Sequence, residues 1–170
     1  ISGYAMWGMN IDGSKKRKLF EFSSSQGAIV RPSLTSLLPE EPNHIMISEN
    51  SRRGSVDDYY KLNINTGAKK RVANGPDVDD GEWISNVVVR TDGIPLAAVS
   101  NRIDEWRIWR YFPEQKAWEV HFTNKCQKPT FFPLSGNDNT WLVAGQDVSK
   151  SNEFNEENDK SKLYSYDPDT

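Results

Sequence analysis

The chain alternates short apolar runs with polar turns along its whole length of 170 residues. The runs, such as Val87–Val89 and Trp141–Ala144, have the length of β-strands rather than of helices. The turns contain Gly, Asn and Asp, as in Asn65-Thr66-Gly67, and these residues tolerate the positive φ angles of tight hairpins. The pattern predicts an all-β chain of antiparallel strands.

One motif, an aromatic residue followed by an apolar residue and a polar turn, occurs four times. Its leading aromatic residues are Trp7, Tyr60, Trp109 and Tyr164, and they are spaced about 50 residues apart, a period typical of propeller blades. The middle strand of each unit is apolar on both faces, as blades that stack on each other require. We therefore expect antiparallel β-propeller blades, forming a partial propeller of about three to four blades.

The predicted organisation is a single partial β-propeller domain over residues 1–170, with strands A to D in each blade. Blade 1 supplies its C and D strands in 4–22, blade 2 spans 33–74, blade 3 spans 82–123, and blade 4 supplies strands A to C in 129–168. Strands A to D are expected at 34–38, 45–49, 58–64 and 69–73 in blade 2, and at 83–89, 95–100, 106–112 and 117–123 in blade 3. The B–C loops are expected at 50–57, 101–105 and 147–160.

The stretch from Ser36 to Ser48 runs as an apolar pair, a proline, two acids, a proline and an apolar strand. It resembles the passage from strand A to strand B in the propellers of prolyl-oligopeptidase-family serine peptidases. Asp58–Gly67, Gly81-Glu82-Trp83 and Arg90–Ala98 are similar to that family as well, so that the resemblance covers residues 34 to 122 best. It implies a propeller that caps a C-terminal α/β-hydrolase domain and restricts access to peptide substrates.

Composition narrows the class of protein further. Hydrophobic residues make up 36% and charged residues 26%, and no apolar run approaches the roughly 20 residues of a membrane-spanning helix. A formal net charge of −3 gives no general attraction for nucleic acid. The single cysteine, Cys126, excludes an internal disulfide. We expect no nucleic-acid or membrane partner, and the compartment stays open.

The sequence lacks the catalytic motif of an α/β-hydrolase. None of the 11 glycines is followed two residues later by serine, so the Gly-x-Ser-x-Gly elbow is missing. A general base would have to be His44, which begins a strand, or His121, which falls on the polar face of strand 117–123. We interpret both histidines as structural. The chain is therefore predicted to be non-catalytic, and the resemblance implies that it is part of a serine peptidase.

Other polar clusters have structural interpretations too. Asp77, Asp79 and Asp80 precede Gly81, but Pro76 and Val78 occupy positions that a calcium loop would use for ligands, so we expect no metal and no cofactor. The basic run 15–18 fits a charged hairpin leading into an edge strand. The acidic pair 40–41 lies in an A–B loop, and the amine-binding role of paired glutamates in some aminopeptidases of the family is not assigned to it.

B–C and D–A connections of a four-stranded antiparallel blade emerge on one face, and there we expect a rim for peptide access. The candidate rim residues are Arg52, Arg53, Arg102, Asp104 and Glu105. The expected partners are the hydrolase domain of the same protein, its peptide substrate and, through open blade edges, a second copy of this chain. The alternative is a stand-alone propeller that serves as a binding platform, like WD-repeat or TolB-like proteins.

Overall fold

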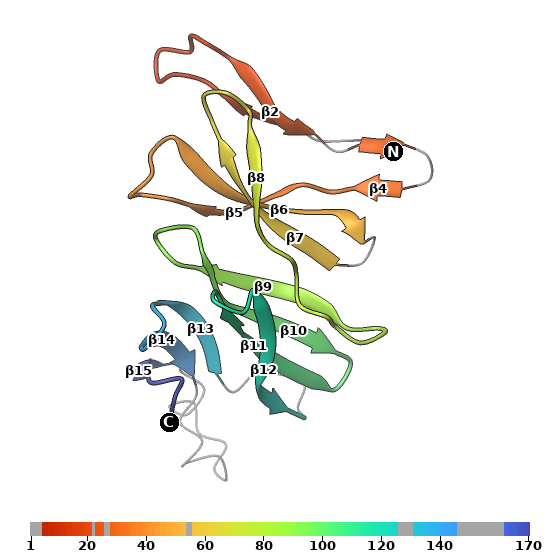
Figure 1. Cartoon of the computed structure of the whole chain (residues 1–170), viewed down its shortest axis with the longest axis vertical. Helices are drawn as coiled ribbons and strands as arrows, with labels where there is room; N and C mark the ends of the chain where they lie inside the picture. The colour runs from red at the N-terminus through yellow and green to blue at the C-terminus, as the bar shows by residue number, and fades with distance from the viewer. Residues whose placement is uncertain (1–4, 22, 26–27, 54–55, 126–130, 146–161) are drawn as a thin grey trace. The chain divides into compact units, whose positions relative to one another are not determined.

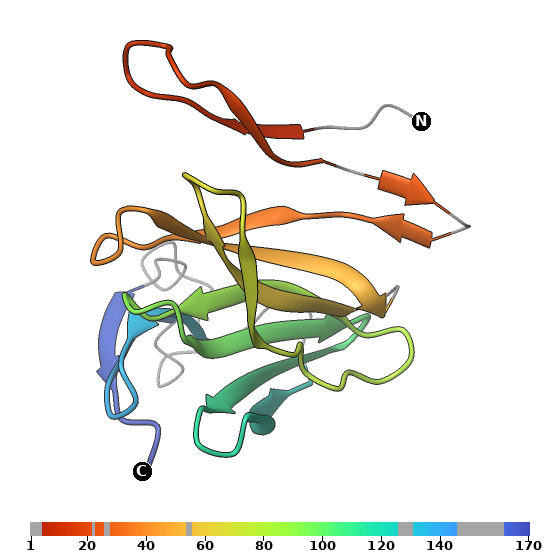
Figure 2. The same cartoon turned by 45° about the horizontal axis from the view of Figure 1, so that its top comes forward.

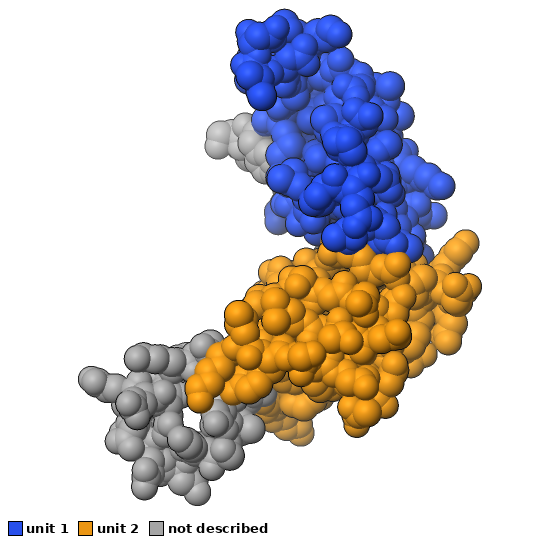
Figure 3. Space-filling model, turned by 90° about the vertical axis from the view of Figure 1, so that its left-hand side faces the viewer, with its two compact units in different colours: residues 1–77, 91–94 blue, residues 78–90, 95–170 orange. Residues whose placement is uncertain are grey.

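The computed structural model describes residues 5–21, 23–25, 28–53, 56–125, 131–145 and 162–170, and of 23–25, 28–29 and 51–53 the backbone only. Every regular element in these residues is a β-strand, and all strand pairs are antiparallel, so the predicted fold class is confirmed. The chain divides into two compact units, residues 1–77 with 91–94 and residues 78–90 with 95–170 (Figure 3). Each unit is described by itself below.

Unit 1 contains a complete four-stranded meander in the order β5-β6-β7-β8 (Figure 1). Its strands are β5 (Ser33–Leu37), β6 (His44–Arg53), β7 (Val56–Asn63) and β8 (Lys69–Ala73). The β7–β8 turn forms because the Asn63 side chain accepts hydrogen bonds from the backbone of Asn65 and Thr66. Gly67 then closes the turn at a φ of 75°, a value that favours glycine.

A hairpin of β1 (Ala5–Gly8) and β2 (Arg17–Glu21) precedes this meander, as predicted for blade 1 (Figure 2). It packs on the meander through Met6, Leu19 and Phe20, which contact a buried cluster of Ile45, Ile47 and Leu62. Two further strands, β3 (Ser23–Ser25) and β4 (Ala28–Val30), form a small hairpin that the sequence analysis missed. The serine-rich sequence of β3 has no apolar alternation that would reveal a strand.

Unit 2 contains a second complete meander, in the order β9-β10-β11-β12, and a three-stranded sheet in the order β13-β14-β15 (Figure 1). The strands are β9 (Trp83–Val89), β10 (Pro95–Arg102), β11 (Glu105–Phe112), β12 (Ala117–Asn124), β13 (Phe131–Gly136), β14 (Trp141–Gly145) and β15 (Lys162–Tyr166). One buried cluster joins the two sheets, because Val88, Leu96 and Ile108 of the first pack with Trp141 and Val143 of the second.

The strand register confirms the repeat that was found in the sequence. Tyr60, Trp109 and Tyr164 lie on β7, β11 and β15, and each is paired with an apolar residue of the preceding strand. The paired residues are Ile47, Ala98 and Val143, respectively. The aromatic residues of the motif therefore hold the same position in successive sheets, and successive sheets stack within each unit. These are the features of propeller-type blades.

Three details differ from the predictions. β6 continues to Arg53 and β7 begins at Val56, so the loop predicted at 50–57 is mostly strand. The loop predicted at 101–105 shrinks to a two-residue turn between β10 and β11 for the same reason. Both predictions were wrong because the polar residues of a hairpin end can still pair in a ladder. The loop predicted at 147–160 lies outside the described residues.

The third difference concerns His121 on β12. In the pairing of β11 with β12, Ile108 lies opposite Phe122 and Trp109 opposite Val120, so His121 is the extra residue of a β-bulge. A bulge redirects side chains. As a result His121 is half-buried against Trp141 and Tyr166, while Val120 is 47% exposed. The prediction that His121 occupies a polar face was wrong, since simple alternation does not anticipate a bulge.

Candidate functional site

The candidate rim residues of unit 2 lie at the β10–β11 hairpin. Arg102 ends β10 and pairs with Glu105 at the start of β11, and Asp104 lies in the turn between them. Arg102 and Asp104 are exposed, whereas Glu105 is half-buried. The hairpin therefore presents the cation of Arg102 and the anion of Asp104 to solvent, whereas the carboxylate of Glu105 is bonded to a further residue.

That residue is Arg107, which the sequence analysis did not single out. Its Nε donates to Glu105 Oε1 at 2.6 Å, and its Nη1 donates to Asp79 Oδ2 at 2.8 Å and to Glu82 Oε2 at 3.1 Å. The hydrogen bond with Asp79, together with the carboxylates of Glu105 and Glu82, raises the pKa of the Arg107 guanidinium. One arginine thus ties the segment before β9 to the hairpin end of β11.

A buried polar chain continues from this arginine into the sheet. Glu82, whose residue is 7% exposed, accepts hydrogen bonds from Ser100 Oγ and, at 3.0 Å, from the backbone N–H of Asp79. Ser100 in turn accepts from Trp109 Nε1 at 2.7 Å and is completely buried. The Glu82 carboxylate is buried at low cost because donors surround it. We name Asp79, Glu82, Ser100, Glu105, Arg107 and Trp109 the carboxylate–arginine network.

The corresponding end of the meander in unit 1 carries different groups. Arg52 and Arg53 end β6, and their side chains lie outside the described part of the structure. Asp58, which is 1% exposed, accepts from the backbone N–H of Gly75 at 3.0 Å and lies 3.9 Å from Arg71. In unit 1 the segment after the last strand is bonded to the third strand through Gly75 and Asp58, and in unit 2 the segment before the first strand is bonded to the third strand through Asp79 and Arg107.

Burial also affects the neighbouring acid, Asp57. Its Oδ2 accepts from Ser48 Oγ at 2.7 Å, which favours the charged form. Burial has the larger effect, and it raises the pKa of the Asp57 carboxyl above its usual range. A raised carboxyl pKa occurs at catalytic sites and at structural ones alike. The partner of Asp57, Ser48, carries a hydroxyl, whereas the described hydrogen bonds of His44 and His121 lead to Asn63 and Tyr166.

The acid pair of the A–B loop contributes to a second polar cluster in unit 1. Glu41 accepts from Lys61 Nζ at 2.6 Å and lies 3.3 Å from His44 Nδ1. Lys61 also donates to the carbonyl of Asp92 at 3.0 Å, and His44 Nε2 lies 3.2 Å from Asn63 Nδ2. Both Glu41 oxygens are thus engaged within the fold.

The second histidine belongs to an aromatic cluster in unit 2. His121 Nε2 lies 2.9 Å from the Tyr166 hydroxyl, and the ring contacts Trp141. Burial and the positive charge of Arg110 lower the pKa of His121. Arg110 itself donates to Asp169 Oδ1 at 2.5 Å. The described hydrogen bonds of His44 and His121 lead to Glu41, Asn63 and Tyr166 rather than to a serine.

Among the described residues, no group of three or more His, Cys, Asp and Glu side chains could hold a metal ion. Asp79, one of the acids once considered for a calcium loop, is bound to Arg107. The same part of the chain contains no helix that is long and apolar enough to cross a membrane. Cys126 lies outside the described residues.

The fold and these clusters define an all-β chain of propeller-type blades whose hairpin ends are fixed by ion pairs and hydrogen bonds. No family model matches the chain, and no curated protein matches its sequence. Among solved structures it is similar to TolB from Acinetobacter baumannii, with 10% sequence identity and a TM-score of 0.49. That similarity covers 96% of this chain but only 35% of the TolB chain, so this chain spans about a third of its length.

Proposed function

We propose that this chain is the non-catalytic propeller portion of a prolyl-oligopeptidase-like serine peptidase, where it gates peptide access and supports a C-terminal α/β-hydrolase domain. The observation that carries the proposal is that residues from the stretches that resemble the family form bonds within the fold. Glu41, from the Pro-acid-acid-Pro stretch, is bound to Lys61 and His44, and Lys61 is also bound to the Asp92 carbonyl. These residues hold turns in place, which is a scaffold's role.

The carboxylate–arginine network supports the same proposal. A gate must keep its shape while substrates pass, and it must not trap them. Each of the three acids around Arg107 is bonded to the guanidinium, so this end of the sheet is fixed by contacts within the fold. The exposed charges of the hairpin are Arg102 and Asp104, one of each sign.

The test uses the complete protein that contains this chain. We expect its sequence to contain Gly-x-Ser-x-Gly followed by Asp and then His, as an α/β-hydrolase requires. The purified protein should cleave a short peptide at least about tenfold more efficiently, in kcat/KM, than the same sequence inserted in a folded protein, because a gate discriminates by size. Replacing the elbow serine by alanine is the control and should abolish both activities.

Two results would contradict the proposal. A complete protein without a hydrolase motif, or one that does not hydrolyse peptides, would favour the alternative of a stand-alone binding platform. Equal cleavage of the short peptide and of the folded substrate would retain the peptidase but remove the gating role.

A further inference from the structure

His121 of β12 lies in the contact between the two sheets of unit 2. Its ring centroid is 5.2 Å from that of Trp141 on β14 and 5.7 Å from that of Tyr166 on β15. One ring nitrogen, Nε2, lies 2.9 Å from the Tyr166 hydroxyl. The β-bulge of β12 directs the side chain to this place. One residue of the first sheet thus contacts two strands of the second, and histidine is the side chain whose charge ordinarily changes near neutral pH.

A cation of the first sheet, Arg110 of β11, acts on His121. Burial lowers the pKa of His121, and the guanidinium of Arg110 lowers it further, whereas the carboxylate of Asp169 acts in the opposite direction. Arg110 is held in place, because its Nη1 donates to Asp169 Oδ1 at 2.5 Å and its Nη2 donates to the carbonyl of Asp138 at 2.9 Å. A proton on His121 therefore places a second cation beside Arg110 at a half-buried position. Further ionisable side chains on the surrounding elements are Glu119 on β12, Arg90 after β9, Asp138 between β13 and β14, Lys162, Tyr164 and Tyr166 on β15, and Asp167 after β15.

Trp141 makes the state of this contact observable. Its ring is completely buried between the two sheets, and its Nε1 has no hydrogen-bond partner among the described residues. The Nε1 of Trp109, by contrast, donates to Ser100 Oγ at 2.7 Å within the first sheet. Burial between the sheets alone therefore protects the indole hydrogen of Trp141 from solvent, whereas a hydrogen bond inside one sheet also protects that of Trp109.

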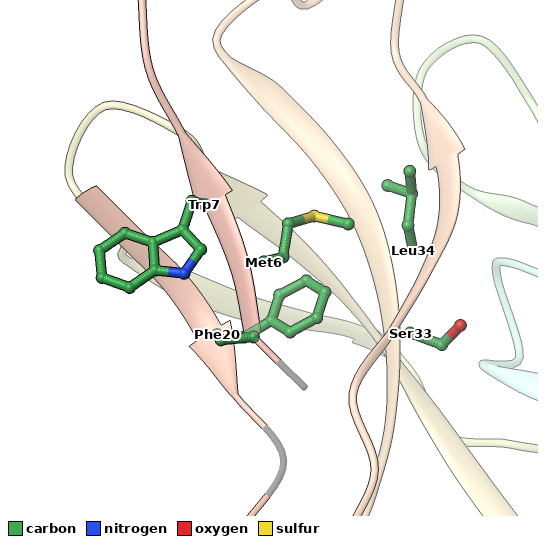
Figure 4. Close-up of a pocket in the computed structure, with 6 residues that line it drawn as sticks. Met6, Trp7, Phe20, Ser33 and Leu34 are labelled. Carbon is green, nitrogen blue, oxygen red and sulfur yellow. The ribbon is translucent and has the colours of Figure 1, made fainter. Parts of the chain in front are cut away.

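The contact between the β1–β2 hairpin and the meander of unit 1 is built differently. Figure 4 shows Met6 and Phe20 of the hairpin beside Leu34 of β5. None of the six residues that line the space between the hairpin and β5 is a histidine or an acid. The buried cluster that the hairpin covers consists of Ile45, Ile47 and Leu62. Protonation of a histidine therefore has no direct effect on this contact, which distinguishes it from the contact at His121.

We propose that His121 is a pH-sensitive joint between the two sheets of unit 2, closed when its ring is neutral and opened when its ring is protonated. In the neutral form the ring packs on Trp141 and is bonded to the Tyr166 hydroxyl. In the protonated form the desolvated imidazolium is repelled by Arg110, so it moves toward solvent and the contact with β14 and β15 loosens. The joint is a conformational device of the fold and does not depend on the proposed peptidase function.

The test measures exchange of the indole hydrogens of Trp141 and Trp109 by NMR, in the 170-residue chain, between about pH 7.5 and about pH 5. Each rate is divided by that of N-acetyltryptophanamide at the same pH, which removes the intrinsic pH dependence of exchange. The relative rate of Trp141 should rise about tenfold toward the acid end, because the joint opens more often, while that of Trp109 should stay constant. The midpoint of the rise should coincide with the titration of the His121 ring in the same spectra.

His121→Gln keeps a polar side chain beside Tyr166 but does not titrate, and it should remove the pH dependence of Trp141 exchange. His44→Gln, the matched control in unit 1, should retain it. A constant Trp141 rate, the same rise in His121→Gln, or a midpoint that differs from the His121 titration would overturn the proposal. An equal rise for Trp109 would overturn it too, because the first sheet itself would then be unfolding. The comparison of midpoints uses the unchanged chain, so it decides the question whether or not His121→Gln folds.

Discussion

The two complete meanders share their strand order but differ in the polar groups at the end where the second strand meets the third. Asp58 and Arg107 each lie two residues before the repeat aromatic of their strand, and Asp58 lies opposite Glu49 in unit 1, whereas Arg107 lies opposite Ser100 in unit 2. Two acids face each other in the first case, and they depend on Lys69, Arg71 and the Gly75 backbone. In the second case the arginine gathers three acids.

The difference shows that blade geometry does not require one particular polar arrangement. The apolar register sets where the strands pair, and each blade then satisfies its buried polar groups with the partners its own sequence supplies. Unit 2 does so mainly with Arg107, Glu82 and Glu105, whose side chains are 21%, 3% and 19% exposed. Unit 1 relies on cations that are about half exposed, since the side chains of Lys69 and Arg71 are 44% and 51% exposed. The ion pairs of unit 2 should therefore contribute more to stability.

The largest loss of stability is expected from substitutions in the buried cores of the two units. Trp141→Ala should destabilise unit 2 by about 4 kcal/mol, because the ring is completely buried between two sheets and contacts the rings of His121 and Tyr166. Ile47→Ala in unit 1 should cost about 3 kcal/mol. Urea unfolding of each variant, followed by circular dichroism, gives both values. A loss below about 1 kcal/mol for Trp141→Ala would mean that the two sheets of unit 2 do not share a core.

A smaller loss of stability is expected from substitutions in the ion pairs of the two units. Arg107→Met should cost about 2 kcal/mol, because it leaves the buried Glu82 carboxylate without its cation while Glu105 and Asp79 lose a donor. Arg71→Met is the matched control and should change the free energy of unfolding by less than about 0.5 kcal/mol. Equal losses of unfolding free energy for the two variants would contradict the claim that the ion pairs of unit 2 contribute more to stability.

His121 should make the stability of unit 2 depend on pH. Its folded pKa is lowered by burial and by Arg110, so the unfolded chain binds the proton more readily. Its contribution is fully present above the ordinary histidine value of 6.5 and is lost as the pH falls below that value. His121→Gln should flatten this dependence between about pH 7.5 and pH 5. An unchanged slope in urea titrations across that range would contradict the assignment.

Asp57 should give unit 1 a slope of the opposite sign. Its folded pKa is raised by burial, so the folded chain holds the proton at a higher pH than the unfolded chain does. The stability is therefore highest below the ordinary value of 3.8 and falls as the pH rises from there toward the folded pKa. Asp57→Asn, which keeps an acceptor for Ser48, should remove that fall and stabilise the protein at neutral pH. Destabilisation by this variant would show that the charged carboxylate is favoured.

The smallest effect is expected at the exposed rim. Arg102→Ala should change the free energy of unfolding by less than about 0.5 kcal/mol, since the side chain is exposed beyond the carboxylate–arginine network. Thermal unfolding of this variant beside Arg107→Met measures the contrast directly. A comparable loss for both variants would place Arg102 inside the network.

Much of the fold could be predicted from the sequence because strand position follows local alternation and turn residues. β8 and β9 have the predicted bounds, and the repeat aromatics share one register. The β-bulge at His121 could not be predicted, since it depends on how β11 pairs rather than on β12 alone. The β3–β4 hairpin was missed because its serine residues carry no apolar signal.

The candidate site was predicted less completely. The hairpin positions of Arg102, Asp104 and Glu105 followed from the turn between two predicted strands. Arg107 and Glu82 were missed because 25 residues separate them in the chain, and only the folded meander brings them together. One available signal was Arg107 itself, a charged residue between the apolar residues Trp106 and Ile108 of its strand. Such a residue usually has a partner when it is not fully exposed.

The central claim is that this chain is a non-catalytic scaffold, and labelling with a fluorophosphonate probe tests it most directly. The probe reacts covalently with serines that a general base has activated. We expect no stoichiometric labelling of the 170-residue chain, because Ser100 is bound to Glu82 and Trp109, and the described bonds of His44 and His121 lead elsewhere. Stoichiometric labelling of one serine, abolished by replacing that serine with alanine, would contradict the account.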